Sequence, residues 1–148
     1  DLLKSYIDLI NERQKRYLDT GQRDHKRFYI VIDELIALIA SANKTAADTL
    51  KQQLETIAVI GRASNIALIL IAQDWNVNAS GISTTLRNQI SVKVAMGRPN
   101  KASLQYLFPD IDSIIVPAGP GTGVISTNSA MDGRAYPLLA PTVAKAVY

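Results

Sequence analysis

The chain has 148 residues, of which 47% are hydrophobic and 20% charged, and its formal net charge at pH 7 is +3. These values are typical of a globular domain and exclude a disordered segment, while the mild positive charge allows a polyanionic partner without requiring one. The sequence has no cysteine, which excludes disulfides and thiolate metal sites, and its only histidine, His25, favours neither a zinc site nor a Ser-His-Asp triad. No apolar run approaches the roughly 20 residues that span a bilayer, so we expect this segment to make no membrane contact.

The first elements are an amphipathic helix and a strand. Apolar residues recur at helical spacing from Leu2 to Tyr17, and Gly21 follows as a stop. Residues 13–27 hold six of the sixteen basic residues, interleaved with acids, which is typical of a solvated helix face and turn. A polar turn over residues 22–27 is predicted to precede the strand.

Residues 28–32 form an apolar, β-prone run that stops at two adjacent carboxylates, Asp33 and Glu34. A strand that is buried on both faces of a parallel sheet is apolar throughout, and its first polar residues lie where it emerges at its carboxyl end. Ligands bind at this edge of open α/β sheets. The doublet therefore predicts a site for chemistry, and the alternative is a buried strand whose acids only cap the next helix.

A helix and a second strand are predicted to follow. Residues 35–40 are a short apolar run that residues 41–44 interrupt, and Thr45 and Asp48 then have the spacing of a capping box for a helix that stops at Gly61. Residues 66–72 are again fully apolar, which predicts a second buried parallel strand. A right-handed crossover would place the two strands side by side or nearly so, with Gln73 at the same edge as Asp33.

The second half of the chain shows shorter elements. We predict a short helix over residues 82–88, a third strand over 90–95 and a helix over 102–108 that Pro109 ends. Residues 114–116, 124–127 and 135–139 are predicted to be short strands separated by glycine and proline turns. We see no repeat or interdomain linker, and at this length we expect one domain over residues 1–148.

In type and order, these residues resemble the FtsK/SpoIIIE family of hexameric DNA-pumping ATPases, within the wider RecA-like and HerA-like motors. The resemblance is to the second half of the motor domain and extends to about Thr127. The stretches that carry it are residues 11–17, 21–24, 28–35, 55–57, 61–66 and 67–73. It implies an α/β chain with the RecA-like P-loop NTPase fold, in which helices flank a mainly parallel sheet and short strands lie near the C-terminus.

The resemblance also implies roles for individual residues. Asp33 would hold Mg²⁺, directly or through water, and Glu34, which ends the Walker B strand, would activate water for attack on the γ-phosphate of ATP. Gln73 would be a sensor of the γ-phosphate or the lytic water, and the alternative is a polar cap on a strand end. Arg62 would be an arginine finger toward a neighbouring subunit, although the helix macrodipole favours a base at this position in any case. Glu55 matches a family position, but we assign it no chemistry.

The departures from the family pattern are informative. The chain has no G-x-x-x-x-G-K-[ST] motif, and the glycine-rich residues 119–123 have no lysine after them, so this turn is not expected to hold phosphate. The family's Walker A segment lies upstream of everything present here, so we expect an ATPase part that is inactive by itself. Residues 74–76 replace the family's Arg-Pro, and residues 102–104 lack the family's arginine. Both differences favour a divergent branch, such as the coupling ATPase of a conjugative element.

The leading hypothesis is therefore part of an ATP-driven translocase for double-stranded DNA that works as a homo-oligomer, expected to be a hexameric ring. The parent protein would be cytoplasmic, with or without a tether to the inner face of the cell membrane. Residues 76–85 and 98–101 are candidate pore-facing segments, with ordinary surface loops as the alternative. A related protein-secretion ATPase and a non-catalytic RecA-like scaffold are the other hypotheses, and we expect the opening helix and an exposed sheet edge to promote self-association.

Overall fold

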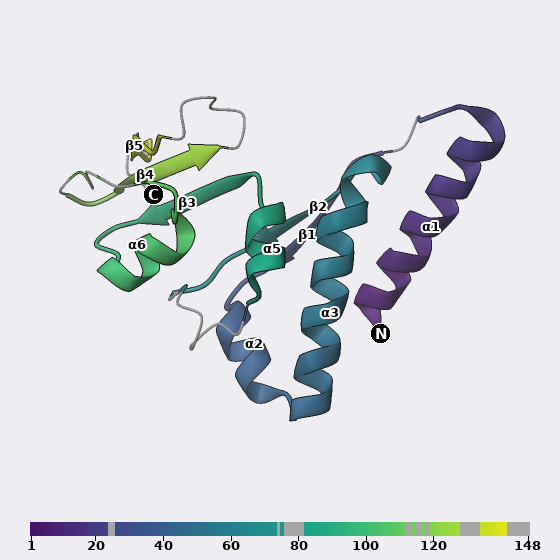
Figure 1. The fold of residues 1–148 in the computed structure, drawn as a ribbon, viewed down its shortest axis with the longest axis horizontal. Helices are drawn as coiled ribbons and strands as arrows, with labels where there is room; N and C mark the ends of the chain where they lie inside the picture. The colour runs from purple at the N-terminus through teal and green to yellow at the C-terminus, as the bar shows by residue number, and fades with distance from the viewer. Residues whose placement is uncertain are drawn as a thin grey trace, which may run out of the picture. The chain divides into compact units, whose positions relative to one another are not determined.

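The computed structural model describes residues 1–23, 26–73, 75, 82–111, 114, 117, 119–127 and 134–141. The chain divides into two compact units, whose elements are labelled in Figure 1. The first unit comprises Asp1–Gln73 and Val77–Gln89, and the second comprises Asp74–Asn76 and Ile90–Tyr148. Each unit has its own sheet.

The first unit contains most of the helices. Its elements are α1 (Leu2–Thr20), β1 (Phe28–Ile32), α2 (Leu35–Ser41), α3 (Lys44–Ile60), the 3₁₀ helix η1 (Gly61–Ser64), β2 (Ile66–Leu70) and α5 (Thr84–Gln89). The predicted opening helix is confirmed: Asp1 caps its start by accepting from the Lys4 amide at 3.4 Å. Gly21 ends α1 in the left-handed conformation, φ 70°, and its amide donates to the Tyr17 carbonyl. Glycine adopts this conformation without the steric cost that a Cβ brings.

The two strands of the first unit form a parallel pair. Phe28 lies opposite Ile66 and Ile32 lies opposite Leu70, with the other residues in register between them. Helix α3 and η1 make the connection from one strand to the next. The predicted adjacency of the two apolar runs is therefore confirmed, and their carboxyl ends lie at one edge of the sheet.

The start of α3 differs from the prediction. The capping residue is Asn43, whose side-chain oxygen accepts from the Ala46 amide at 2.9 Å, and the helix begins at Lys44. The backbone of Asn43 is extended, ψ 163°, so its carboxamide is free to reach back over the first turn. Thr45 already lies inside the helix, and the predicted capping box of Thr45 and Asp48 is wrong.

The core of the first unit lies between the sheet and the helices that pack on one of its faces. Helices α1 and α3 lie side by side (Figure 1), and the side chains of Ile10, Leu54 and Ile57 are completely or almost completely buried. On the other face of the sheet, Tyr29 and Val31 are more than half exposed. The prediction of strands buried on both faces is therefore wrong, because the described helices of this unit cover only one face.

The second unit is built on an antiparallel sheet. Its elements are β3 (Val92–Met96), α6 (Lys101–Leu107), β4 (Thr122–Thr127) and β5 (Tyr136–Leu139), and the strand order is β3-β4-β5. Three of the five described strands are thus antiparallel, which corrects the prediction of a mainly parallel sheet. A turn with positive φ at Gly119 and Gly121 leads into β4, which runs antiparallel to β3. Of the strand predicted over residues 114–116, all but residue 114 lies outside the described residues.

A small core holds the second unit together. Ala95 on β3, Val124 on β4 and the end of α6 at Leu107 and Phe108 are buried against one another, and Trp75 packs on this cluster. The Trp75 amide lies 3.4 Å from the Ser103 hydroxyl oxygen on α6. Among the described residues of the whole chain, no helix combines the length and the apolar character that a membrane crossing requires.

Candidate functional site

The carboxyl edge of the parallel sheet holds the polar side chains that the sequence singled out. Backbone pairing continues past the ends of both strands: the Ile71 amide donates to the Ile32 carbonyl at 2.9 Å, and the Leu35 amide donates to the Ile71 carbonyl at 3.0 Å. Leu35 is fully buried at the start of α2. These contacts fix where the chain leaves each strand, and they place Glu34 beside Gln73.

Three predicted site residues meet at this edge. The Gln73 Nε2 donates to the Glu34 Oε1 at 3.0 Å, and the Glu34 amide donates to the Asp33 Oδ1 at 3.1 Å. All three side chains are exposed. The structure thus brings a carboxamide that follows β2 together with two carboxylates that follow β1, and the bonded pair, Glu34 and Gln73, lies 39 positions apart along the chain.

The backbone of Glu34 is strained. It adopts the left-handed conformation, with φ 55° and ψ 50°, which only glycine adopts without steric cost. Glu34 precedes the first residue of α2, yet its side chain makes no capping hydrogen bond. Glu34 therefore does not stabilise the start of α2 through its side chain. Strain of this kind is concentrated at functional positions in proteins.

The donor atoms at this edge suit Mg²⁺ bound together with a nucleotide. Carboxylate and carboxamide oxygens are hard ligands, which Mg²⁺ prefers, and one or two carboxylates with waters and phosphates are its usual protein environment. The described part of the chain contains no group of three or more His, Cys, Asp or Glu side chains that would hold a metal without other ligands. Asp33 is exposed, so it can approach a metal–phosphate complex from the edge of the sheet.

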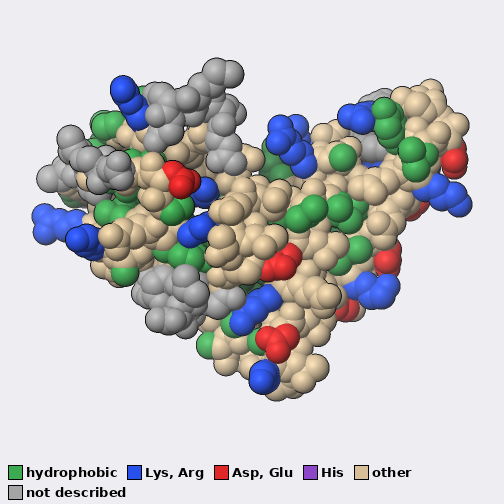
Figure 2. Space-filling model, viewed as in Figure 1, with side chains coloured by type: hydrophobic (Ala, Val, Ile, Leu, Met, Phe, Trp, Pro, Cys, Tyr) green, Lys and Arg blue, Asp and Glu red, His purple; other side chains and the backbone are tan. Residues whose placement is uncertain are grey.

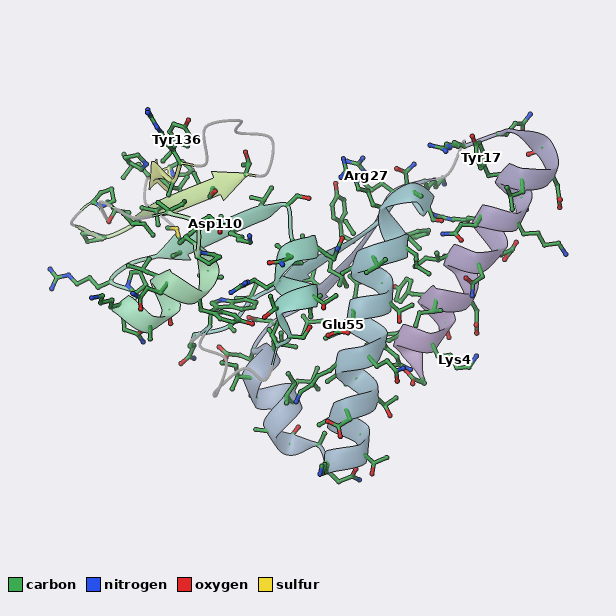
Figure 3. The ribbon with its side chains drawn as sticks, viewed as in Figure 1. Lys4, Tyr17, Arg27, Glu55, Asp110 and Tyr136 are labelled. Carbon is green, nitrogen blue, oxygen red and sulfur yellow. The ribbon has the colours of Figure 1, made fainter. Side chains whose placement is uncertain are left out.

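Arg62 lies at the opposite end of the sheet. It belongs to η1, directly before β2, whereas Gln73 follows β2. The five residues of β2 alone span about 13 Å, since a strand rises about 3.3 Å per residue. An arginine at one end therefore does not share a site with Glu34 at the other end of the same sheet. Arg27 also lies at the amino end of β1, as Figure 3 shows.

Glu55 has a structural partner that the sequence did not predict. The Ser83 hydroxyl donates to the Glu55 Oε1, and the same hydroxyl oxygen accepts from the Leu86 amide at 3.0 Å. Glu55, labelled in Figure 3, thus connects α3 to the start of α5. The sequence signal for this contact was a serine three residues before a helical leucine, which is a common start of a helix.

The remaining candidate segments lie elsewhere. In the glycine-rich turn, the Thr122 hydroxyl lies 2.9 Å from the Pro117 carbonyl oxygen and 2.7 Å from that of Gly119, so this residue closes a turn that leads into β4. Of the predicted pore-facing segments, residues 76–81 lie outside the described residues. Arg98 and Lys101 are exposed before and at the start of α6.

Comparison with solved structures identifies the class of fold. The chain has the fold of FtsK/SpoIIIE-type P-loop ATPases, so the resemblance seen in the sequence is confirmed at the level of the fold. One similar structure is the pCW3 conjugation coupling protein TcpA in its monomer form with ATPγS, with a TM-score of 0.69, 21% identity, and coverage of 86% of this chain and 40% of that chain. Another is the cytoplasmic domain of the type VII secretion ATPase EccC of Thermomonospora curvata, with a TM-score of 0.65, 16% identity, and coverage of 99% of this chain and 18% of that chain.

The chain therefore spans less than half the length of either of these two proteins. No protein-family model matches the sequence, and no curated protein matches it. At these identities the likeness defines the fold, and the activity has to be argued from the residues at the edge of the sheet.

Proposed function

We propose that residues 1–148 form one domain of a larger ATP-driven translocase of double-stranded DNA, and that this domain supplies the residues that activate water. The observation that carries the proposal is the contact of Gln73 with Glu34, beside Asp33, at the carboxyl edge of two neighbouring parallel strands. This is the edge at which open α/β sheets bind ligands. The P-loop that would hold the phosphates belongs to a part of the motor outside this chain.

The proposed chemistry assigns one task to each residue. Asp33 holds Mg²⁺ directly or through a water molecule, and bound MgATP supplies the γ-phosphoryl group. Glu34 orients the attacking water and takes its proton. Gln73 keeps the Glu34 carboxylate in place through its Nε2, and its amide dipole is available to the γ-phosphate or to the water. The strained backbone of Glu34 belongs with this task, because the side chain is not engaged in capping α2 and bonds to Gln73 instead.

Arg62 is proposed to act on the nucleotide of a neighbouring copy. Its place at the amino end of the sheet puts it on the side of the domain opposite to the carboxylates. Head-to-tail contacts between copies close into a ring when the rotation permits it, and in the proposed ring they bring the amino end of one sheet to the carboxyl end of the next. A hexameric ring with Arg62 serving in trans fits this arrangement. Arginine fingers in related chemistry raise kcat by about 10³ to 10⁵.

Double-stranded DNA is the proposed substrate, and a polypeptide is the second candidate. The net charge of +3 and the exposed Arg98 and Lys101 favour a polyanion that is bound through its backbone. The second candidate rests on the likeness to a secretion ATPase, which extends over 99% of this chain. We place the motor in the cytoplasm, where ATP is available, with or without a membrane tether on another part of the protein.

The test is the ATPase activity of the full protein that carries this chain and its P-loop, with and without linear double-stranded DNA. We expect DNA to stimulate turnover and Glu34→Gln to abolish it. Asp48→Asn, an exposed acid on α3, is the matched control and should leave turnover unchanged. Turnover that DNA does not change, but that Glu34→Gln removes, would favour the secretion motor. A protein without any turnover would be the non-catalytic scaffold.

A further inference from the structure

Helix α1 is fastened to the amino end of the parallel sheet by Arg13. One terminal nitrogen of its guanidinium, Nη1, donates to the Ser64 carbonyl at 2.7 Å and to the Lys26 carbonyl at 3.1 Å. The guanidinium also lies over the Phe28 ring, 4.9 Å from its centroid. One side chain from α1 therefore contacts the segment that enters β1 and the segment that enters β2.

Further contacts join α1 to the turn Gly61–Ser64 and to the end of α3. The Gln14 Nε2 lies 3.5 Å from the Ile60 carbonyl oxygen, and the Ser64 hydroxyl, which is buried, lies 3.4 Å from the Ile10 carbonyl oxygen. Gly61 lies so close to the Ile66 carbonyl oxygen that a Cβ on Gly61 would be 2.8 Å from it. Helix α1 thus packs closely along the turn that carries Arg62.

This turn has little intrinsic stability. A 3₁₀ helix of four residues has poor hydrogen-bond geometry and rarely persists without support. It ends at Asn65 in the left-handed conformation, φ 56°. Among the described residues, the Arg62 guanidinium has no hydrogen bond or ion pair, and its side chain is exposed. The direction in which Arg62 projects is therefore set by the backbone of the turn, and Arg13 is the charged group that holds this backbone.

We propose that Arg13 is a positioning residue that holds the turn Gly61–Ser64 so that Arg62 reaches the nucleotide of a neighbouring copy. The inference rests on the proposed function, in which Arg62 acts in trans. Figure 2 shows separate basic side chains, with acidic ones beside them, toward the end of the first unit where α1 ends and β1 begins. Arg13 differs from them because it is half-buried and its donors are engaged by backbone carbonyls. In this proposal Arg13 orders the turn Gly61–Ser64, and Arg62 is the residue that reaches the neighbouring copy.

The first experiment measures the order of the turn in the 148-residue chain by hydrogen exchange. In Arg13→Gln, the amides of residues 61–65 should exchange about tenfold faster, a factor that corresponds to about 1.4 kcal/mol and lies near the lower end of what a hydrogen bond from a charged group contributes. The amides of residues 101–107, in the second unit, should keep their rates. Arg16→Gln is the matched control on the same helix, since among the described residues the Arg16 side chain makes only an exposed ion pair with Glu12 at 3.8 Å. Unchanged exchange at residues 61–65 in Arg13→Gln would overturn the proposal.

The second experiment is a double-mutant cycle on the ATPase activity of the full protein. We expect Arg62→Ala to lower kcat by about 10³, and Arg13→Gln to lower kcat by about tenfold with KM for ATP unchanged, a coupling of the usual size for residues linked through a backbone shift. In the Arg62→Ala background, Arg13→Gln should have no further effect. Arg13→Lys should restore part of the loss, because lysine keeps the charge without the planar fork of donors.

The outcomes separate this inference from the proposed function. If Arg13→Gln lowered kcat just as much in the Arg62→Ala background as in the unmodified protein, the positioning role would be overturned. Full kcat in the Arg13→Gln protein, together with a reduced kcat in the Arg62→Ala protein, would overturn it as well. Activity that survives Arg62→Ala but not Glu34→Gln would remove the trans-acting finger, and with it the role of Arg13, while leaving the ATPase proposal intact. Activity that survives Glu34→Gln would refute the proposed chemistry itself.

Discussion

The left-handed backbone of Glu34 makes a sharp prediction about stability. At φ 55° and ψ 50°, a side chain with a Cβ is destabilised by about 1–2 kcal/mol relative to glycine. Glu34→Gly and Glu34→Ala both lose the hydrogen bond from Gln73, so the two variants differ only in whether a Cβ remains. We therefore expect Glu34→Gly to be more stable than Glu34→Ala by about 1 kcal/mol.

An ordinary helix position provides the control for this comparison. Asp48 is exposed in α3, where glycine is less favourable than alanine by about 0.8–1 kcal/mol. The order of stability of the two substitutions should thus be reversed between the sites. The glycine variant should be the more stable one at position 34, and the alanine variant the more stable one at position 48. The difference between the two sites should be about 2 kcal/mol, which is larger than the usual error of a denaturation experiment.

Urea unfolding of the 148-residue chain, followed by far-ultraviolet circular dichroism, measures both pairs. The long helices α1 and α3 belong to the first unit, so the signal reports on the unit that contains Glu34. If Glu34→Ala were as stable as Glu34→Gly, Glu34 would not be strained in solution. That result would refute the argument that strain is stored at the carboxyl edge of the sheet. In the full protein, Glu34→Gly should be at least as stable as Glu34→Ala and equally inactive, a separation of stability from function.

Three further predictions follow from packing. Gly61→Ala should destabilise the first unit by about 1–3 kcal/mol in urea unfolding, since the new Cβ would lie 2.8 Å from the Ile66 carbonyl oxygen. The φ of −66° at this position suits alanine, so an increase in stability would show that the backbone of the turn shifts to make room for the Cβ. Leu54→Ala should cost about 2–5 kcal/mol in the same assay, because this side chain is fully buried, and a loss below 1 kcal/mol would mean that the core collapses around it. The sheet face that carries the exposed Val31 and Ile69 should make the chain self-associate. Replacing both residues by threonine should shift the mass measured by light scattering toward that of the monomer, with the fold retained. An unchanged mass would show that the contact between copies lies elsewhere.

Several features of the site were predictable because they depend on short stretches of sequence. Apolar runs that end at Asp33-Glu34 and at Gln73 identify two strands and the polar residues at their ends, and a right-handed crossover is enough to place those ends at one edge. The position of Arg62 before the second run likewise follows from chain order. These inferences need only local patterning and the handedness of the connection.

Other features were not predictable from local patterns. The pairing of Arg13 with the Ser64 carbonyl joins residues 51 positions apart, and a basic residue on a polar helix face is, by pattern, a solvated one. The antiparallel direction of β3 against β4 depends on how the connection between them, which contains α6, packs and returns to the sheet. The left-handed conformation of Glu34 could not be predicted from the sequence either, since none of the neighbouring residues requires a positive φ at this position.

The sequence by itself determined the two neighbouring strands of the first unit and the residues at their carboxyl edge, because hydrophobic periodicity and the abrupt onset of charge are properties of the chain read in order. Only the tertiary structure decided which face of each strand is covered, that Glu34 is strained and in contact with Gln73, and that Arg13 fastens α1 to the turn that carries Arg62. These depend on packing between segments distant in sequence, where the free energy of each contact is set by the geometry of both partners and not by either stretch alone.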